Sequence, residues 1–93
     1  MTTDLDTLAR ATLIANDRGA YTVPNGRVYP FQWNWDSAFV ALGFDTFDRD
    51  RAWTEIETLF RAQWDDGFVP HIVFCIYHFF TSTIFCRRAC TTR

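Results

Sequence analysis

The chain has 93 residues, enough for one small domain with a modest core and a thin stability margin. Its 48% apolar content argues against wholesale disorder, and its net charge of −2 gives no electrostatic support for a nucleic-acid partner. The first residues, MTTDLDTLAR, lack the basic-then-apolar pattern of a secretory signal, so we expect a cytoplasmic location.

A first helix is predicted from about residue 5 to residue 16, where apolar residues recur at helical spacing. Thr3 or Asp4 can cap its start, and the run NDRG at residues 16–19 supplies its stop. Residues 20–34 contain two prolines and an Asn-Gly pair, so they are predicted to form a looped or extended connector.

A second helix is predicted to start at the capping residues Asp36 and Ser37 and to run to about Phe47. Residues 38–44, AFVALGF, are apolar on every side of this helix, which is typical of a helix inside a larger body. The run is too short to cross a bilayer. The helix therefore needs protein on more than one side, and the core is expected to lack partners.

A third helix is predicted from Asp48 or Arg49 to Trp64, with Asp65-Asp66-Gly67 ending it. Its sequence divides into an apolar stripe that should face inward and a set of polar positions outside that stripe. The apolar stripe comprises Ala52, Trp53, Ile56, Leu59 and Phe60, and the outer positions are Arg51, Glu55, Thr58 and Arg61.

Residues 31–39, FQWNWDSAF, carry the most distinctive chemistry of the chain. A Trp ring packs against the apolar face of a sugar, and a fixed carboxylate accepts hydrogen bonds from sugar hydroxyls. Gln32 and Asn34 add amide donors and acceptors, so the segment suits carbohydrate recognition. The alternative interpretation is structural, with Trp33 and Trp35 filling a core and Asp36 capping a helix.

Three motifs follow one another in the chain: QWNWDSAF at residues 32–39, DRDRA at 48–52 and QWDDGFVPHIVF at 63–74. With these motifs, the segment from Tyr29 to Phe74 resembles the N-terminal part of the catalytic domain of family 63 glycoside hydrolases, the group of mannosylglycerate hydrolases and related mannosyl-oligosaccharide glucosidases. That group shows the patterns Q-W-x-W-D-S/T-x-F, D-x-x-R-A and Q-W-x-x-G-x-x-P-H-I-x-F in the same order. The likeness covers about residues 5–74.

The resemblance implies an all-α fold: an incomplete piece of an (α/α) barrel of six helix pairs, with about three helices and an irregular tail. Residues 1–74 would form the N-terminal part of that domain, and residues 75–93 an unrelated-looking tail. By family analogy, the subsite for the sugar would be lined by Tyr29, Gln32, Trp33, Trp35, Asp36 and His71. The implied partner is a small saccharide or glycoside, and no cofactor or metal is implied.

The implied reaction is inverting hydrolysis of an α-linked glucoside or mannoside, such as mannosylglycerate. It needs an acid and a base carboxyl about 6.5–9.5 Å apart. In the family both acids come from motifs downstream of the matched stretch. Glu55 and Glu57 are predicted to lie on different helix faces, and Asp65 and Asp66 to point apart, so no local pair replaces them. No catalytic residue is assigned, and we expect the chain alone to be inactive.

Residues 75–93 hold all three cysteines and no acid. Our hypothesis is that a frameshift or assembly error produced this tail, which resequencing of the locus would test. Residues 68–85 are apolar enough to raise a membrane span as an alternative, but Pro70 and two histidines argue against it. The spacing of the possible zinc ligands fits no standard zinc site; these are His71, Cys75, His78, Cys86 and Cys90.

Three functions therefore stand after the sequence alone. The preferred one is a truncated hydrolase segment that carries part of a sugar subsite. A stand-alone carbohydrate-binding or interaction module keeps the Trp-Asp cluster without needing catalytic acids. A small membrane-associated protein is the weakest of the three.

Overall fold

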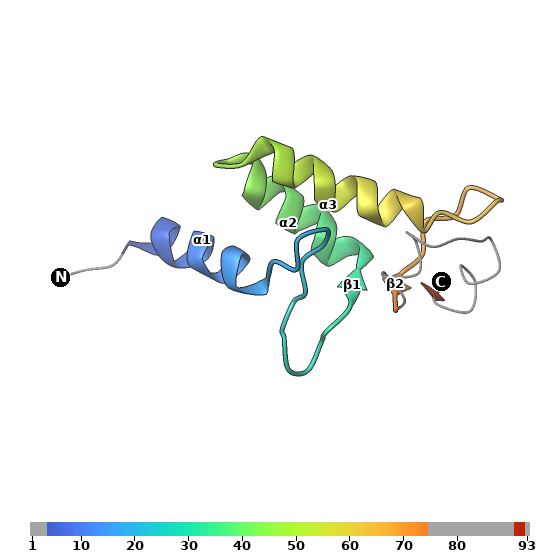
Figure 1. Ribbon diagram of the computed structural model, residues 1–93, viewed down its shortest axis with the longest axis horizontal. Coiled ribbons are helices and arrows are strands. Elements are labelled where there is room, and N and C mark those ends of the chain that lie inside the picture. Colours follow the sequence, from blue (N-terminus) through green and yellow to red (C-terminus); the bar gives the residue numbers. More distant parts are fainter. Residues whose placement is uncertain (1–3, 75–90, 93) are drawn as a thin grey trace.

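The computed structural model describes residues 4–74 and 91–92, and these residues form three helices and three short strands (Figure 1). The helices confirm the expectation of a mainly α-helical chain. In chain order the elements are α1 (Leu5–Asn16), β1 (Gln32–Trp33), α2 (Asn34–Asp45), α3 (Arg49–Arg61), β2 (Ile72–Val73) and β3 (Thr91–Thr92).

Helix α1 begins and ends where the sequence predicts. The Asp4 carboxylate accepts a hydrogen bond of 2.7 Å from the Thr7 N–H, which makes Asp4 the N-cap. After the helix, Gly19 takes a φ of +91°, and its N–H donates to Asp17 Oδ1 at 2.7 Å, so the chain turns back. No residue of α1 is buried, and its N-terminal half extends away from the other helices (Figure 1).

Helix α2 begins at Asn34, two residues before the predicted caps, so the expectation that Asp36 and Ser37 cap it is wrong. Trp33 occupies the N-cap position and makes no capping hydrogen bond with its side chain. The start of the helix is fixed from elsewhere in the chain, because the Asn34 N–H donates to the His71 carbonyl at 2.9 Å. Asp36 lies in the first turn of α2.

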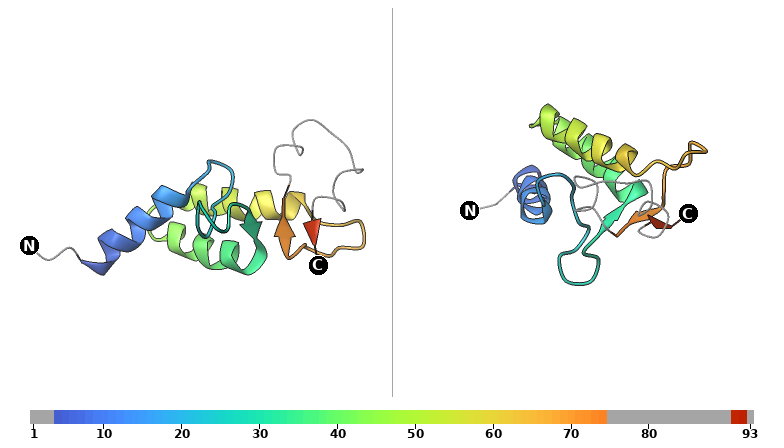
Figure 2. Two further views of the ribbon diagram at one scale, coloured as in Figure 1. Left: turned by 90° about the horizontal axis from the view of Figure 1, so that it is seen from below. Right: turned by 45° about the vertical axis from the view of Figure 1, so that its right-hand side comes forward.

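Helices α2 and α3 lie side by side as a helical hairpin (Figures 1 and 2). Helix α3 begins at Arg49, as predicted, and the Asp48 carboxylate caps it by accepting from the Arg51 N–H at 3.0 Å. The helix ends at Arg61 and not at Trp64. Two clusters of buried apolar side chains pack between these helices and the segments connected to them. One comprises Ala41, Phe44 and Ala52, and the other Tyr21, Val23, Leu59, Ala62 and Val73.

The side of α3 that faces inward differs from the prediction. Arg51, Glu55 and Thr58 are buried, whereas Trp53 and Phe60 are 61% and 52% exposed. The three polar residues recur at i, i+4 and i+7, so they share one face of the helix. That face meets polar partners in the connector and in α2, which offset the cost of burying a charge. The predicted apolar stripe holds only for Ala52 and Leu59, which are buried, and Ile56, which is half-buried.

The three strands form an antiparallel sheet in the order β1-β2-β3. Gln32 is paired with Val73, and Trp33 with Ile72. Because β1 runs directly into α2, this pairing sets the residues before β2 beside the first turn of α2.

The all-round apolar helix is covered on one side. Ala41 and Phe44 of α2 are buried, whereas Phe39 and Leu42 are 64% and 67% exposed. None of the helices in the described part of the chain is long and apolar enough to cross a membrane. Most of the alternative span at residues 68–85, and all three cysteines, lie outside the described residues.

Candidate functional site

The predicted site residues gather around the junction of β1 and α2. Trp33 ends β1, and Trp35 and Asp36 lie in the first turn of α2. His71 directly precedes β2, and its carbonyl accepts from the Asn34 N–H at 2.9 Å. The Asn34 side chain donates to the Pro70 carbonyl at 3.0 Å and to the Val69 carbonyl at 3.4 Å, so three hydrogen bonds of Asn34 tie this junction to the segment before β2.

Aromatic rings give this junction an open apolar surface. Trp35 is 68% exposed and meets Phe39 edge-on, with 5.6 Å between ring centroids. Tyr29 is half-exposed and meets Trp33 edge-on, with 5.5 Å between ring centroids. More than half of Trp35 and of Tyr29 is open to solvent, and an accessible indole is what a sugar ring can stack on.

Asp36 is half-buried and His71 is exposed, so both can reach a ligand from solvent. Asp36 lies in the first turn of α2, where the partial positive charge of the helix terminus favours a carboxylate. An ionised carboxylate only accepts hydrogen bonds, and sugar hydroxyls are suitable donors.

Gln32 differs from the other predicted site residues because its side chain is fully buried. Its Nε2 donates to Ser37 Oγ at 3.0 Å and to the Glu55 carbonyl at 3.2 Å. Gln32 therefore supports the junction from inside. Its direct contact with a ligand stays a prediction, which the burial of its side chain does not favour.

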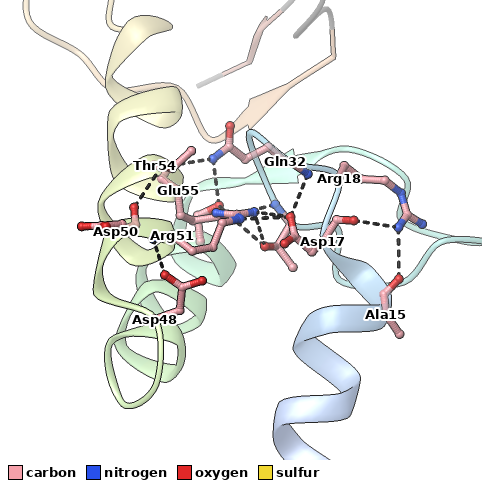
Figure 3. Close-up of polar contacts among 12 residues, drawn as sticks. Ala15, Asp17, Arg18, Gln32, Asp48, Asp50, Arg51, Thr54 and Glu55 are labelled. Atoms are coloured by element: carbon pink, nitrogen blue, oxygen red, sulfur yellow. Dashed lines mark hydrogen bonds and ion pairs between the residues drawn. The ribbon is translucent and has the colours of Figure 1, made fainter.

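A buried polar network lies beneath the junction, and Figure 3 shows its central residues. Glu55 of α3 is fully buried. Its Oε1 accepts from Ser37 Oγ at 2.7 Å and from the Thr22 N–H at 3.1 Å, and its Oε2 accepts from Thr22 Oγ1 at 2.9 Å. Arg51 Nη1 lies 3.0 Å from the same Oε2 in an ion pair. One carboxylate thereby joins α3 to α2 and to the connector.

Arg51 extends this network to the end of α1. Its guanidinium donates to Asp17 Oδ1 from Nη2 at 2.8 Å and lies 4.8 Å from the centroid of the Phe44 ring. Burial alone would raise the Asp17 pKa, but hydrogen bonds from Arg51 and Gly19 and the charge of Arg51 lower the pKa below its ordinary value. Burial alone would lower the Arg51 pKa, but Asp17 and Glu55 outweigh it and raise the pKa.

The sequence analysis missed this network because it placed Arg51, Glu55 and Thr58 on the outer face of α3. The available signal was their own spacing, which is as regular as that of the apolar residues. Their partners Thr22 and Ser37 lie in segments far along the chain, and no local pattern relates them.

Within residues 4–74 and 91–92, no group of His, Cys, Asp and Glu side chains forms a metal-binding cluster. Three acids of α2, α3 and their connection already have other contacts: Asp45 pairs with Arg49 at 2.9 Å, Asp48 caps α3, and Glu55 is buried in the network. In the described part of the chain, we therefore assign no pair of carboxylates to glycoside hydrolysis.

The arrangement of helices matches solved structures of a known class. It superimposes on a GH63 mannosylglycerate hydrolase of Thermus thermophilus, in complex with Tris and D-glycerate, with a TM-score of 0.73 and 53% identity. That match covers 76% of this chain and 18% of the other. A structure of the same enzyme with glucose matches with a TM-score of 0.71 and 51% identity over 76% of this chain and 18% of that one. The fold is therefore part of an all-α glycoside hydrolase domain of the (α/α) barrel class.

The sequence defines the family more narrowly. Residues 29–85 match the mannosylglycerate hydrolase MGH1-like glycoside hydrolase domain, and the chain belongs to this family. The match continues past residue 74, where we placed the end of the motif-bearing part; the division of the chain at that residue stays a prediction.

Curated relatives agree with this assignment. Mannosylglycerate hydrolase MGH1 of Selaginella moellendorffii is 55% identical over 70% of this chain and 13% of its own length. Mannosylglycerate hydrolase of Thermus thermophilus is 57% identical over 63% of this chain and 14% of its own length. Glucosylglycerate hydrolase of Mycolicibacterium hassiacum is 44% identical over 77% of this chain and 16% of its own length. The chain thus spans only about a seventh of the relatives it matches.

Proposed function

We propose that this chain supplies the sugar-holding part of a glycosylglycerate hydrolase domain and has no hydrolytic activity by itself. The observation that carries the proposal is the convergence of Trp33, Trp35, Asp36 and His71 at the start of α2, with the Trp35 ring open to solvent. The activity of the whole domain would be hydrolysis of an α-linked mannoside or glucoside such as mannosylglycerate.

Each group has a distinct role in this proposal. The Trp35 ring stacks on the sugar, and Tyr29 and Trp33 form the adjoining aromatic wall. Asp36 accepts hydrogen bonds from sugar hydroxyls, and the exposed His71 side chain supplies a further polar contact from the neighbouring segment.

The acid and base for an inverting reaction would come from residues other than those described here. The two carboxyls must lie about 6.5–9.5 Å apart across the sugar ring. Glu55 is unsuited to either role, because it is fully buried and its oxygens are already bonded. The chain alone should therefore release no mannose from mannosylglycerate.

A hybrid enzyme tests the proposal. Residues 29–74 of this chain replace the matching segment of the Thermus thermophilus mannosylglycerate hydrolase, and mannose release from mannosylglycerate is measured. We expect an active hybrid whose activity falls with Trp35→Ala and persists with Trp53→Ala, a Trp of similar exposure on α3. Equal losses in the two variants would count against a stacking role for Trp35.

The exposure of Trp35 and Tyr29 also favours a second candidate, a stand-alone carbohydrate-binding module. Calorimetric titration of the chain alone with mannosylglycerate, trehalose and short α-glucosides separates the candidates. Binding by the isolated chain that is lost in Trp35→Ala would favour the module, and the absence of binding would favour a part that works only within a domain.

A further inference from the structure

The two residues that bracket the site segment are both bonded to Glu55. Ser37 follows Asp36, and its Oγ lies 2.7 Å from Glu55 Oε1. Gln32 precedes Trp33, and its Nε2 lies 3.2 Å from the Glu55 carbonyl oxygen. The segment at residues 33–36 is therefore anchored at both ends to one residue of α3.

These hydrogen bonds have a fixed direction. A carboxylate only accepts, so the Ser37 hydroxyl must donate to Glu55 and can then accept from Gln32 Nε2, 3.0 Å away. The Glu55 carbonyl likewise only accepts, which fixes the amide of Gln32 with Nε2 toward α3. The Glu55 carboxylate thus orients the Ser37 hydroxyl directly, and it acts on Gln32 through the hydrogen bond that Ser37 Oγ accepts from Gln32 Nε2.

The bonding capacity of Glu55 is filled. A carboxylate has about four acceptor positions, and this one takes three hydrogen bonds and one ion pair. Moving its side chain would break contacts to Thr22, Ser37 and Arg51 together. The Glu55 carboxylate is therefore held in one position next to the site segment.

Stability alone does not explain a buried charge in this place. Buried ion pairs can often be replaced by well-packed apolar residues with little loss of stability. Apolar contacts, however, have no direction and would leave the segment free to shift or rotate, whereas directional bonds select one geometry.

We propose that Glu55 is a positioning residue for the sugar site: through Ser37 and Gln32 it holds Trp33, Trp35 and Asp36 in the geometry that binds the sugar. The ligand role of these three residues rests on the proposed function, but their being held by Glu55 does not. Glu55 touches no sugar in this proposal.

Hydrogen exchange of the full chain tests the positioning directly. The reporter is the Asn34 amide, which bonds to the His71 carbonyl at the site, and the reference is the amide of buried Phe44 in the same helix. In Glu55→Gln, Asn34 exchange should quicken by roughly tenfold more than Phe44 exchange, the effect of weakening a hydrogen bond to a charged group. The matched control Glu57→Gln changes an exposed carboxylate of the same helix and should alter neither amide.

Ser37→Ala is a milder variant, because it keeps the Arg51–Glu55 ion pair and removes only the hydrogen bond from α2 to Glu55. If Glu55→Gln does not fold, Ser37→Ala decides whether Glu55 positions the segment. It should also quicken Asn34 exchange selectively. In the double variant, the effect should be no larger than in Glu55→Gln, because both changes break the same connection. An equal acceleration of Asn34 and Phe44 in the variants would show a general loss of stability and overturn the proposal.

The hybrid enzyme separates this proposal from the functional one. Glu55→Gln in the hybrid should lower kcat/KM by roughly tenfold, consistent with a poorly placed binding segment, and Glu57→Gln should not. If the unmodified hybrid is inactive, the proposed function fails, while the exchange rates still decide whether Glu55 positions the segment.

Discussion

Replacing Arg51 with Met should unfold the α2–α3 hairpin, because it leaves the buried Glu55 carboxylate without a cation. Met retains an apolar stem of similar length, so the change removes the guanidinium with little loss of side-chain volume. The guanidinium contacts Asp17, Glu55 and the Phe44 ring at once.

The expected loss of folding free energy in Arg51→Met is large relative to the total stability of a small domain. Removing one partner of a buried ion pair costs about 3–5 kcal/mol. Small domains have about 5–15 kcal/mol of stability in total, and this one has exposed faces on α2 and α3 that lower it further. The loss should therefore consume most of the stability of the hairpin.

Helical circular dichroism at room temperature is the assay, and Arg49→Met is the matched control. Arg49 lies on the same helix and pairs with Asp45 at 2.9 Å, but both side chains are largely exposed. Its loss should cost no more than about 1 kcal/mol. Glu55→Gln added to Arg51→Met should restore part of the helical signal, because the uncompensated charge is gone. Equal signals from Arg51→Met and Arg49→Met would refute the argument.

Two further predictions concern stability. Because the pKa of Asp17 is lowered in the folded chain, the stability that its ionised carboxylate contributes is fully present above the ordinary pKa of 3.8 and is lost as the pH falls through the folded pKa. Asp17→Asn should therefore remove this part of the acid-induced loss of helical signal. An unchanged pH profile in the variant would contradict the prediction. Because Phe39 and Leu42 are exposed, the chain should bind a hydrophobic dye and unfold over a broad temperature range. The double variant Phe39→Ser, Leu42→Gln should bind less dye without losing helicity. A sharp two-state thermal transition of the monomeric chain would count against this account.

Both limits of α1 and the start of α3 were predictable because local chemistry sets them, whereas α2 and α3 end two and three residues before the predicted positions. Asp4 and Asp48 cap α1 and α3 through hydrogen bonds to the third residue along, and Gly19 turns the chain after α1. The start of α2 was not predictable in this way, because the Asn34 N–H bonds to the distant carbonyl of His71.

The inward face of α3 was only half predictable. Ala52 and Leu59 followed the hydrophobic pattern, but Arg51 and Glu55 are inside because each compensates the charge of the other. Thr22 and Ser37 also donate hydrogen bonds to Glu55, and Asp17 and Thr22 accept from Arg51. Two stripes with helical spacing competed for the interior, and only the tertiary contacts decide between them.

For the candidate site, the sugar-binding role of the aromatic and carboxylate residues stays a prediction, and the fold brings the backbone of His71 to Asn34 at the start of α2. The burial of Gln32 was not foreseen, because an amide beside two tryptophans suits a ligand and a support equally well. Its role became clear only from the contacts to Ser37 and Glu55.

The most direct test of the central claim, that the start of α2 holds a sugar, is kcat/KM for mannosylglycerate in the hybrid enzyme with Asp36→Asn. The account predicts a fall of about ten- to a hundredfold, the loss of a charge-assisted hydrogen bond to the substrate. Asp50→Asn, which changes an exposed aspartate in the first turn of α3, should have no effect. A hybrid that keeps full activity with Asp36→Asn would contradict the claim.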